Sequence, residues 1–143
     1  FRLDGSTGGQ NQSGSSGYSY YSNLAQNTYA YYSSIGQSNL AYAWYYYYQG
    51  NGLYLYYYSQ QPWQALYNYC EYIGHYYFYA LWNDRQYANA YYKLYEGWAL
   101  AHWCWYSQQG DDYRATFFYR KKDQADHERI QSRWAGGGGC KRQ

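Results

Sequence analysis

Aromatic and polar residues alternate along the chain from Tyr18 to about Gln61. Within it, residues 41–58 form two Tyr-rich runs on either side of Gly50-Asn51-Gly52. Because Asn-Gly between two strand-like runs is a strong signal for a tight turn, this segment predicts a β-hairpin. Both faces of such strands would be heavily aromatic, which favours a position between two layers.

Turn-forming residues recur farther along the chain, at Gly74, Asn83-Asp84, Glu96-Gly97 and Gly110-Asp111-Asp112. The segments between them are about 8–12 residues long, a spacing typical of a β-meander, a sandwich or a barrel. A meander, a sandwich or a stacked-sheet arrangement is therefore expected. Residues 113–122 alternate most clearly, whereas residues 123–134 place Ile130 and Trp134 at helical spacing. We therefore expect a mainly β fold with a short C-terminal helix.

A second interpretation, an all-α fold of helical hairpins, stays open. Residues 62–109 also contain Ala, Leu, Gln and Glu, and Pro62 suits the first turn of a helix. One set of residues is loosely similar to a helix-turn-helix repeat of the tetratricopeptide kind: Trp98, Ala101, Trp105, Gly110, Tyr113 and Ala115. The pattern does not keep its register in a second copy, and no family is assigned from it.

Composition divides the chain into three segments. Residues 1–17 are rich in Gly, Ser and Gln, residues 18–122 form the aromatic-rich structural domain, and residues 123–143 hold the charged helix and a Gly-rich tail. The sequence Ser-Asn-Leu-Ala occurs at 22–25 and again at 38–41, but one repetition does not establish a repeat architecture.

Tyrosine takes the place of the usual aliphatic residues. The chain has 28 Tyr, 7 Trp and 4 Phe, and it contains neither Val nor Met. A tyrosine ring buries a large apolar area, but its hydroxyl needs a hydrogen-bond partner once it leaves water. Many phenols are satisfied more easily between chains than inside one small core. This composition predicts a homo-oligomer or a component of a larger assembly.

Charge is distributed unevenly. No charged residue lies between Asp4 and Glu71, and thirteen of the twenty charges lie from Asp111 onward. A long uncharged segment lacks the repulsion that keeps surfaces apart. We expect a structural protein that forms a filament, a sheath or a larger complex. Its self-association residues are expected in the tyrosine runs: Tyr45, Tyr46, Tyr47, Tyr48, Tyr56, Tyr57, Tyr58, Tyr76, Tyr77, Tyr91 and Tyr92.

No pattern of catalytic or metal-binding residues stands out. His75, His102 and His127 lie far apart, with no HExxH motif and no Cys pair beside them. Cys104 lies two residues after His102, but nothing marks an oxyanion hole or a third orienting group. Asp111-Asp112 is better explained by turn chemistry. We expect no enzyme, no cofactor and no metal site.

One basic and aromatic cluster suggests an alternative function. It consists of Phe117, Phe118, Tyr119, Arg120, Lys121 and Lys122. Aromatic rings beside Lys and Arg can stack on bases and contact phosphates, so a binding module for glycans or single-stranded nucleic acid is the rival hypothesis. A solvated charged edge that protects a strand from unwanted pairing would look the same.

Cysteine content and hydropathy leave the cellular location open, with a lean towards the outside of the cell or its surface. Cys70, Cys104 and Cys140 are too few and too scattered for a disulfide framework or a Cys-based zinc site. One pair with a spare thiol and three free thiols both remain open. No apolar run reaches the 18 to 20 residues or so of a membrane-spanning helix.

Overall fold

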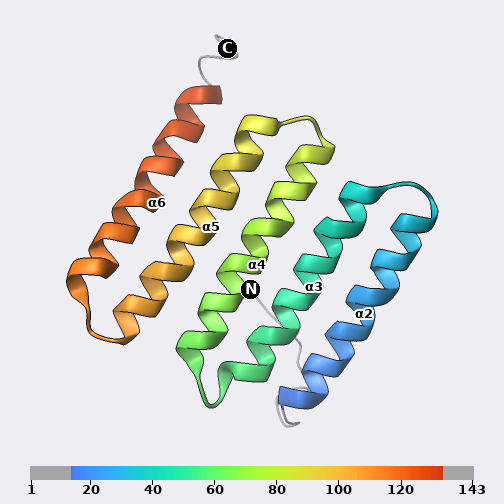
Figure 1. Cartoon of the computed structure of the whole chain (residues 1–143), viewed down its shortest axis with the longest axis horizontal. Helices are drawn as coiled ribbons and strands as arrows, with labels where there is room; N and C mark the ends of the chain where they lie inside the picture. Colours follow the sequence, from blue (N-terminus) through green and yellow to red (C-terminus); the bar gives the residue numbers. More distant parts are fainter. Residues whose placement is uncertain (1–13, 134–143) are drawn as a thin grey trace.

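The computed structural model describes residues 14–133, and within them all regular structure is helical (Figure 1). The five helices follow one another along the chain: α2 (Gly14–Ser34), α3 (Ser38–Tyr58), α4 (Pro62–Asn83), α5 (Tyr87–Gln108) and α6 (Asp112–Arg133). The expectation of a mainly β fold is therefore wrong, and the alternative of helical hairpins describes residues 14–133.

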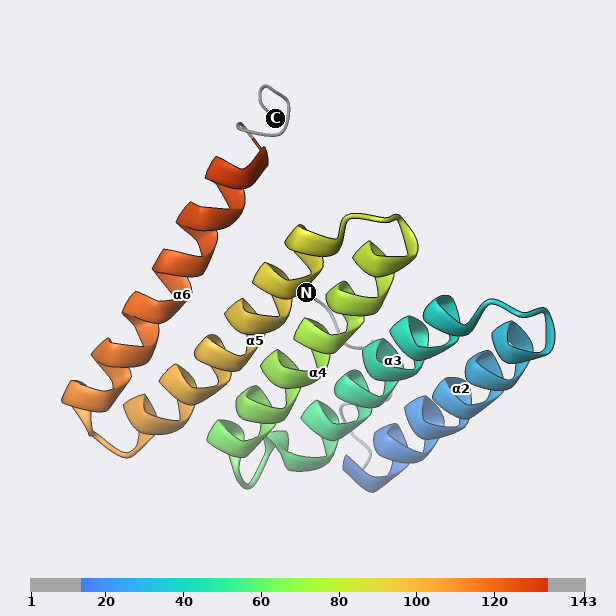
Figure 2. The same cartoon turned by 45° about the horizontal axis from the view of Figure 1, so that its top comes forward.

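The helices lie side by side in a single layer. Among the described residues, each helix contacts only the helix before it and the helix after it. Figures 1 and 2 show neighbouring helices running in opposite directions, with α2 at one edge of the layer and α6 at the other. Both broad faces of α3, α4 and α5 are therefore left without a second layer of the described chain.

Each turn between helices has three residues, and the four turns share one hydrogen-bonding pattern. The last turn residue accepts a hydrogen bond through its carbonyl from the N–H of an alanine four positions later. The pairs are Gln37 and Ala41, Gln61 and Ala65, Gln86 and Ala90, and Asp111 and Ala115. Their spacing of 24, 25 and 25 residues is the repeat length of the fold.

Three of the turns bend through a residue with positive φ at the middle position. These residues are Gly36 at 77°, Arg85 at 64° and Gly110 at 76°. Glycine adopts this left-handed conformation without a steric penalty, which is why it commonly follows the end of a helix. At Gly36 and Gly110 the sequence itself favours a tight helical hairpin, whereas Arg85 adopts the same conformation with a side chain that disfavours it.

Small residues line the contacts between helices. In α3, Gly52 packs against Tyr21 of α2, whereas Gly50 packs against Tyr72 of α4. Residues two apart on a helix point in nearly opposite directions. Gly52 therefore allows the close approach of α2, and Gly50 allows that of α4. The core is correspondingly made of small side chains: Ala25, Ala41, Ala43, Ala65, Ala90, Ala99, Ala101, Ala115 and Ala125 are buried.

The predicted hairpin at residues 41–58 does not form. Helix α3 continues through Gly50-Asn51-Gly52, and the buried Asn51 side chain donates a hydrogen bond to the Tyr47 carbonyl at 2.8 Å. Gly50 and Gly52 are needed here because the neighbouring helices approach too closely for a larger side chain, not because the chain turns. Tertiary packing overrides the local strand preference of tyrosine.

The predicted turns at Gly74 and Glu96-Gly97 and the predicted strand at residues 113–122 do not form either. Gly74 and Gly97 lie in the middle of α4 and α5, where these two helices approach each other. Residues 113–122 are not a strand but the first half of α6, and the predicted short helix after Asp123 is its second half. The turns at Asn83-Asp84 and Gly110-Asp111 and the helix start at Pro62 are confirmed.

We predict that replacing Gly97 by Leu strongly destabilises the layer. A Cβ atom at Gly97 would lie 2.8 Å from the Gly74 Cα and 2.9 Å from the Cys70 carbonyl oxygen. Overpacking a site of this kind typically costs about 1–3 kcal/mol. Urea unfolding followed by circular dichroism measures the loss. The matched control is Ala88→Leu on the same helix, where the side chain is exposed. An equal loss in both variants would contradict the packing explanation.

Candidate functional site

One broad face of the layer carries an aromatic ridge along α5. Tyr87, Tyr91, Tyr95 and Trp98 follow one another at spacings of three and four residues, which places them on one side of the helix. All four are exposed, Tyr91 at 56%. We call these four residues the α5 ridge.

Aromatic residues of the neighbouring helices extend the ridge sideways. On α4, Phe78 and Trp82 have ring centroids 5.3 and 5.7 Å from that of Tyr91. On α6, Phe118 lies 5.2 Å from Trp98. We call the side of the layer that holds these rings the first face.

The first face continues over α3. Phe78 contacts Tyr79 at 5.2 Å, and the Tyr79 ring stacks on Tyr42 and Tyr46 of α3, with centroids 5.1 and 5.8 Å apart. Tyr42 then meets Tyr29 of α2 at 5.5 Å. The first face is therefore aromatic from α2 to α6.

Two of the three histidines are fixed within this face. The Nδ1–H of His102 donates to the Trp98 carbonyl at 2.9 Å, and its ring stacks on Phe118 at 4.9 Å. His75 donates likewise to the Glu71 carbonyl at 2.8 Å and stacks on Tyr46 at 4.8 Å. Rings held in this way pack as aromatic side chains. Within residues 14–133 there is no cluster of three or more His, Cys, Asp or Glu side chains that could hold a metal ion.

The opposite side of the layer, the second face, differs between its two halves. Over α3 and α4 it is aromatic, since Tyr76 contacts Trp44 and Tyr47 at 5.5 and 5.2 Å. Over α5 and α6 it is charged. Lys93 pairs with Glu96 at 2.7 Å, and Lys122 pairs with Asp126 at 3.4 Å.

Burial raises the pKa of several phenols above its ordinary value. These are Tyr46 and Tyr72 beside the first face and Tyr69 and Tyr76 on α4, and neighbouring phenols add to the effect. A neutral phenol can both donate and accept a hydrogen bond. The faces therefore combine apolar ring area with uncharged polar groups.

The predicted self-association residues are divided between the two sides because successive helical residues point about 100° apart. Tyr46 and Tyr91 belong to the first face, whereas Tyr47, Tyr76 and Tyr77 belong to the second. Tyr45 and Tyr48 contact α2. Tyr56 and Tyr58 are exposed near the end of α3, and Tyr57 and Tyr92 are half-buried. The α5 ridge was missed except for Tyr91, although its spacing of three and four residues was a readable signal.

The predicted basic and aromatic cluster is also split by the helix. Phe118 belongs to the first face, while Tyr119 and Lys122 lie on the second, where the Lys122 Nζ is 4.6 Å from the Tyr119 ring centroid. The other three residues, Phe117, Arg120 and Lys121, line a shallow groove of about 530 Å³ on the outer side of α6, together with Asp112, Tyr113, Thr116 and Gln124.

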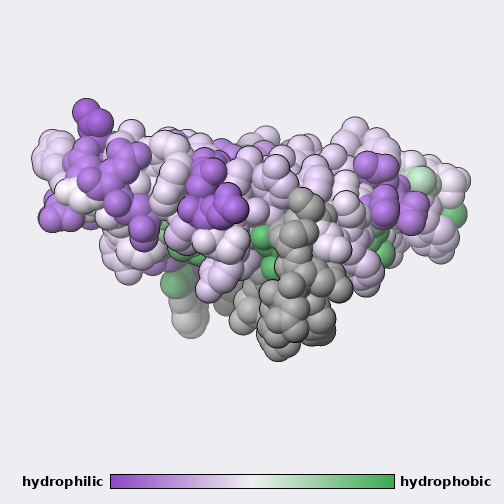
Figure 3. All heavy atoms as spheres, turned by 90° about the horizontal axis from the view of Figure 1, so that it is seen from below, coloured by the Kyte–Doolittle hydropathy of each residue, from purple (hydrophilic) through white to green (hydrophobic). Residues whose placement is uncertain are grey.

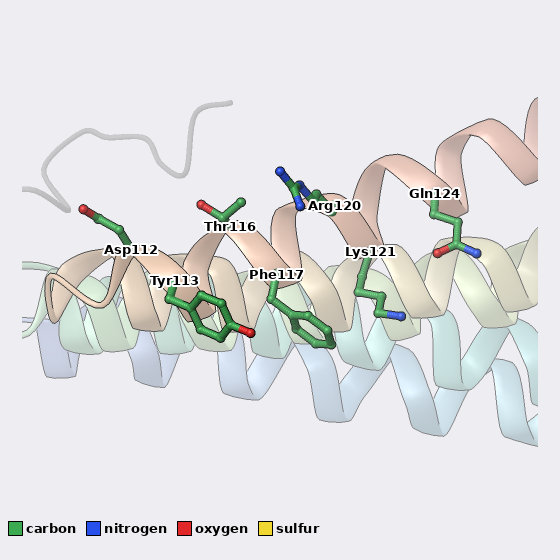
Figure 4. A pocket seen from close by; sticks show the side chains of 7 residues that line it. All are labelled: Asp112, Tyr113, Thr116, Phe117, Arg120, Lys121 and Gln124. Carbon is green, nitrogen blue, oxygen red and sulfur yellow. The ribbon is translucent and has the colours of Figure 1, made fainter.

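The groove exposes aromatic rings and a positively charged side chain to solvent. Figure 4 shows Tyr113, Phe117 and Lys121 in line along α6. The Lys121 Nζ lies 5.2 Å from the Phe117 ring centroid, and Tyr113 is 84% exposed. In Figure 3, which looks at the layer from its edge, the largest hydrophilic area lies at the α6 end. The charge asymmetry of the sequence is thus an asymmetry between the two edges of the layer.

Comparison with known protein families, with curated proteins and with solved structures gave no match. Among the described helices, none combines the length and the apolar character that crossing a membrane requires.

Two carboxyl groups meet between α5 and α6. Burial and the hydrogen bond with Asp126 raise the pKa of Glu96, although Lys93 acts in the opposite direction. Burial also acts to raise the pKa of Asp126, but the hydrogen bond with Glu96 and the Lys122 charge lower it overall. The two carboxyl groups therefore interact with each other as well as with the neighbouring lysines, Lys93 beside Glu96 and Lys122 beside Asp126.

We predict that Glu96→Gln stabilises the protein at neutral pH. The raised pKa means that the stability contributed by protonated Glu96 is present at low pH and is lost as the pH rises through the folded-state pKa. Gln keeps a neutral donor at every pH. Thermal unfolding should show a midpoint about 2–5 °C higher at about pH 7.5, with the difference vanishing near pH 4. The control is the exposed Glu128→Gln, and a gain that persists unchanged at low pH would disprove the assignment.

Proposed function

We propose that this protein is a structural, self-assembling component whose aromatic faces pack against those of other copies. The observation that carries the proposal is the single layer of helices. Domains normally bury their apolar surface between two or three layers. Here each described helix has only lateral neighbours, and both faces of the layer carry aromatic rings.

The burial pattern supports this proposal. No large side chain of the described residues is fully buried, and fifteen large apolar or aromatic side chains are exposed. Burying such area gains roughly 25 cal/mol per Å². A stable interface of ordinary size removes about 800 Å² from water on each partner, which a broad face of five helices of 21 or 22 residues has room to supply.

The chemistry of the faces suits contact between copies. Tyr and Trp are enriched at protein interfaces because a rigid ring buries much area while its polar group still reaches a partner. Helices α2 and α3 carry no charge at all. When two such faces stack, no like charges repel each other over α2 and α3.

Self-association should depend on the α5 ridge. We expect sedimentation velocity to show dimers or larger species of the wild-type protein at micromolar concentration. The double variant Tyr91→Glu/Tyr95→Glu should weaken association at least tenfold, roughly 1.4 kcal/mol, because it would bury charge in the contact. The matched control is Tyr113→Glu, which changes a more exposed tyrosine on the outer side of α6. At about 100 μM even weak dimers of micromolar affinity are populated. A wild-type protein that stays monomeric at that concentration would refute the proposal.

A second candidate function, binding of single-stranded nucleic acid, is favoured by the groove on α6. Tyr113 and Phe117 offer exposed rings for base stacking, and Arg120 and Lys121 offer cations for phosphates. These are the two components of non-specific single-strand binding.

Fluorescence anisotropy with a labelled oligothymidylate tests this candidate. We expect Arg120→Ala/Lys121→Ala to weaken binding about tenfold and to reduce the salt dependence, since two phosphate contacts are lost. The control Arg85→Ala/Arg114→Ala removes the same amount of charge elsewhere. If both double variants lose affinity equally, the effect is one of net charge and the groove is not the site.

A further inference from the structure

Two of the three cysteines meet at the contact between α4 and α5. On α5, His102 and Trp105 flank Cys104 in the sequence, and both contact Tyr67 of α4, three residues before Cys70. The Cys70 and Cys104 side chains are half-buried, and each thiol shifts the pKa of the other. Both are free thiols in this structure. Sequence spacing alone left open whether the chain holds a pair and a spare thiol or three separate thiols.

The backbones of α4 and α5 approach very closely here. A Cβ atom at Gly97 would lie only 2.9 Å from the Cys70 carbonyl oxygen, so the α4 backbone at Cys70 lies directly against α5. The side chain of a helical residue tilts towards the N-terminus of its own helix. Because α4 and α5 are antiparallel (Figure 1) and Tyr67 of α4 contacts Trp105 of α5, the Cys70 and Cys104 side chains tilt towards each other. A disulfide requires this kind of short backbone separation with converging Cβ atoms.

The two thiols are not equivalent. A hydrogen bond from Cys70 lowers the pKa of Cys104, although burial acts against it. The same interaction, together with burial, raises the pKa of Cys70. Since the thiolate is the reactive form, we expect Cys104 to react with an oxidant before Cys70 does.

We propose that Cys70 and Cys104 are a peroxide-sensitive pair that closes into a reversible disulfide linking α4 to α5. The Cys104 thiolate attacks the hydroperoxide, the O–O bond breaks, and Cys104 becomes a sulfenic acid while an alcohol, or water, leaves. The Cys70 sulfur then attacks the Cys104 sulfur, gives up its proton and displaces water. In total, two thiols lose two electrons and two protons, and one hydroperoxide is reduced to an alcohol and water.

The link lies at the centre of the layer. Helix α4 is the third and α5 the fourth of the five described helices. Among the described helices the contacts are lateral, between sequence neighbours, so a covalent bond here ties the α2–α4 half to the α5–α6 half. The oxidised protein should resist thermal unfolding better than the reduced protein, because the disulfide restricts the unfolded chain.

The full-length chain with Cys140→Ala, which removes the spare thiol, is the protein to test. After a few equivalents of hydrogen peroxide, intact mass spectrometry should show a loss of about 2 Da, and peptide mapping should show the Cys70–Cys104 link within one chain. Dimedone added during oxidation should label Cys104 in preference to Cys70. The unfolding midpoint should rise by about 5 °C and return after reduction.

Two further samples make the result decisive. In the same protein unfolded in urea, formation of the link should slow at least about tenfold, because the fold no longer holds the sulfurs together. Cys104→Ala should abolish both the link and the dimedone adduct. Oxidation to sulfinic acid without a link, disulfides between chains only, or a link that forms equally fast in urea would each overturn the proposal.

Discussion

The whole layer depends on the close approach of neighbouring helix backbones at small residues. Gly50, Gly52, Gly74 and Gly97 occupy positions where an added Cβ would meet the facing helix, and nine buried alanines complete the contacts. Helices that approach so closely leave no room between them for tyrosine or tryptophan. The large rings are therefore displaced to the two faces, where they contact one another over the seams between helices.

That displacement explains why the protein has much aromatic surface and little conventional core. In an ordinary domain a second layer would cover these rings. Here the described residues offer none, and both the proposed self-association and the proposed nucleic-acid binding draw on the same unburied rings. The two proposals differ in place, since the first uses the broad faces over α3 to α5 and the second uses the charged outer edge at α6.

Much of the site could not be read from consecutive residues. The four tyrosines at 45–48 look like one feature in the sequence. In the helix, Tyr46 lies on the first face and Tyr47 on the second, while the other two contact α2. The basic and aromatic cluster at residues 117–122 is divided in the same way. The α5 ridge, in contrast, was readable from its spacing of three and four residues, and so was the recurring Gln or Asp four positions before a buried Ala. Both signals were hidden by the strand preference of tyrosine and by reading Gly-Asn-Gly as a turn.

The sequence by itself determined the excess of aromatic rings, the uncharged first half, the charged α6, and the helix boundaries at Pro62, Asn83-Asp84 and Gly110-Asp111, because composition and turn chemistry are local properties. Only the tertiary structure decided that Gly50, Gly74 and Gly97 are packing residues rather than turns, that Cys70 meets Cys104, and which ring belongs to which face. Each of these depends on what lies across the contact from a residue. A glycine in the chain looks the same whether it allows a turn or admits a neighbouring helix.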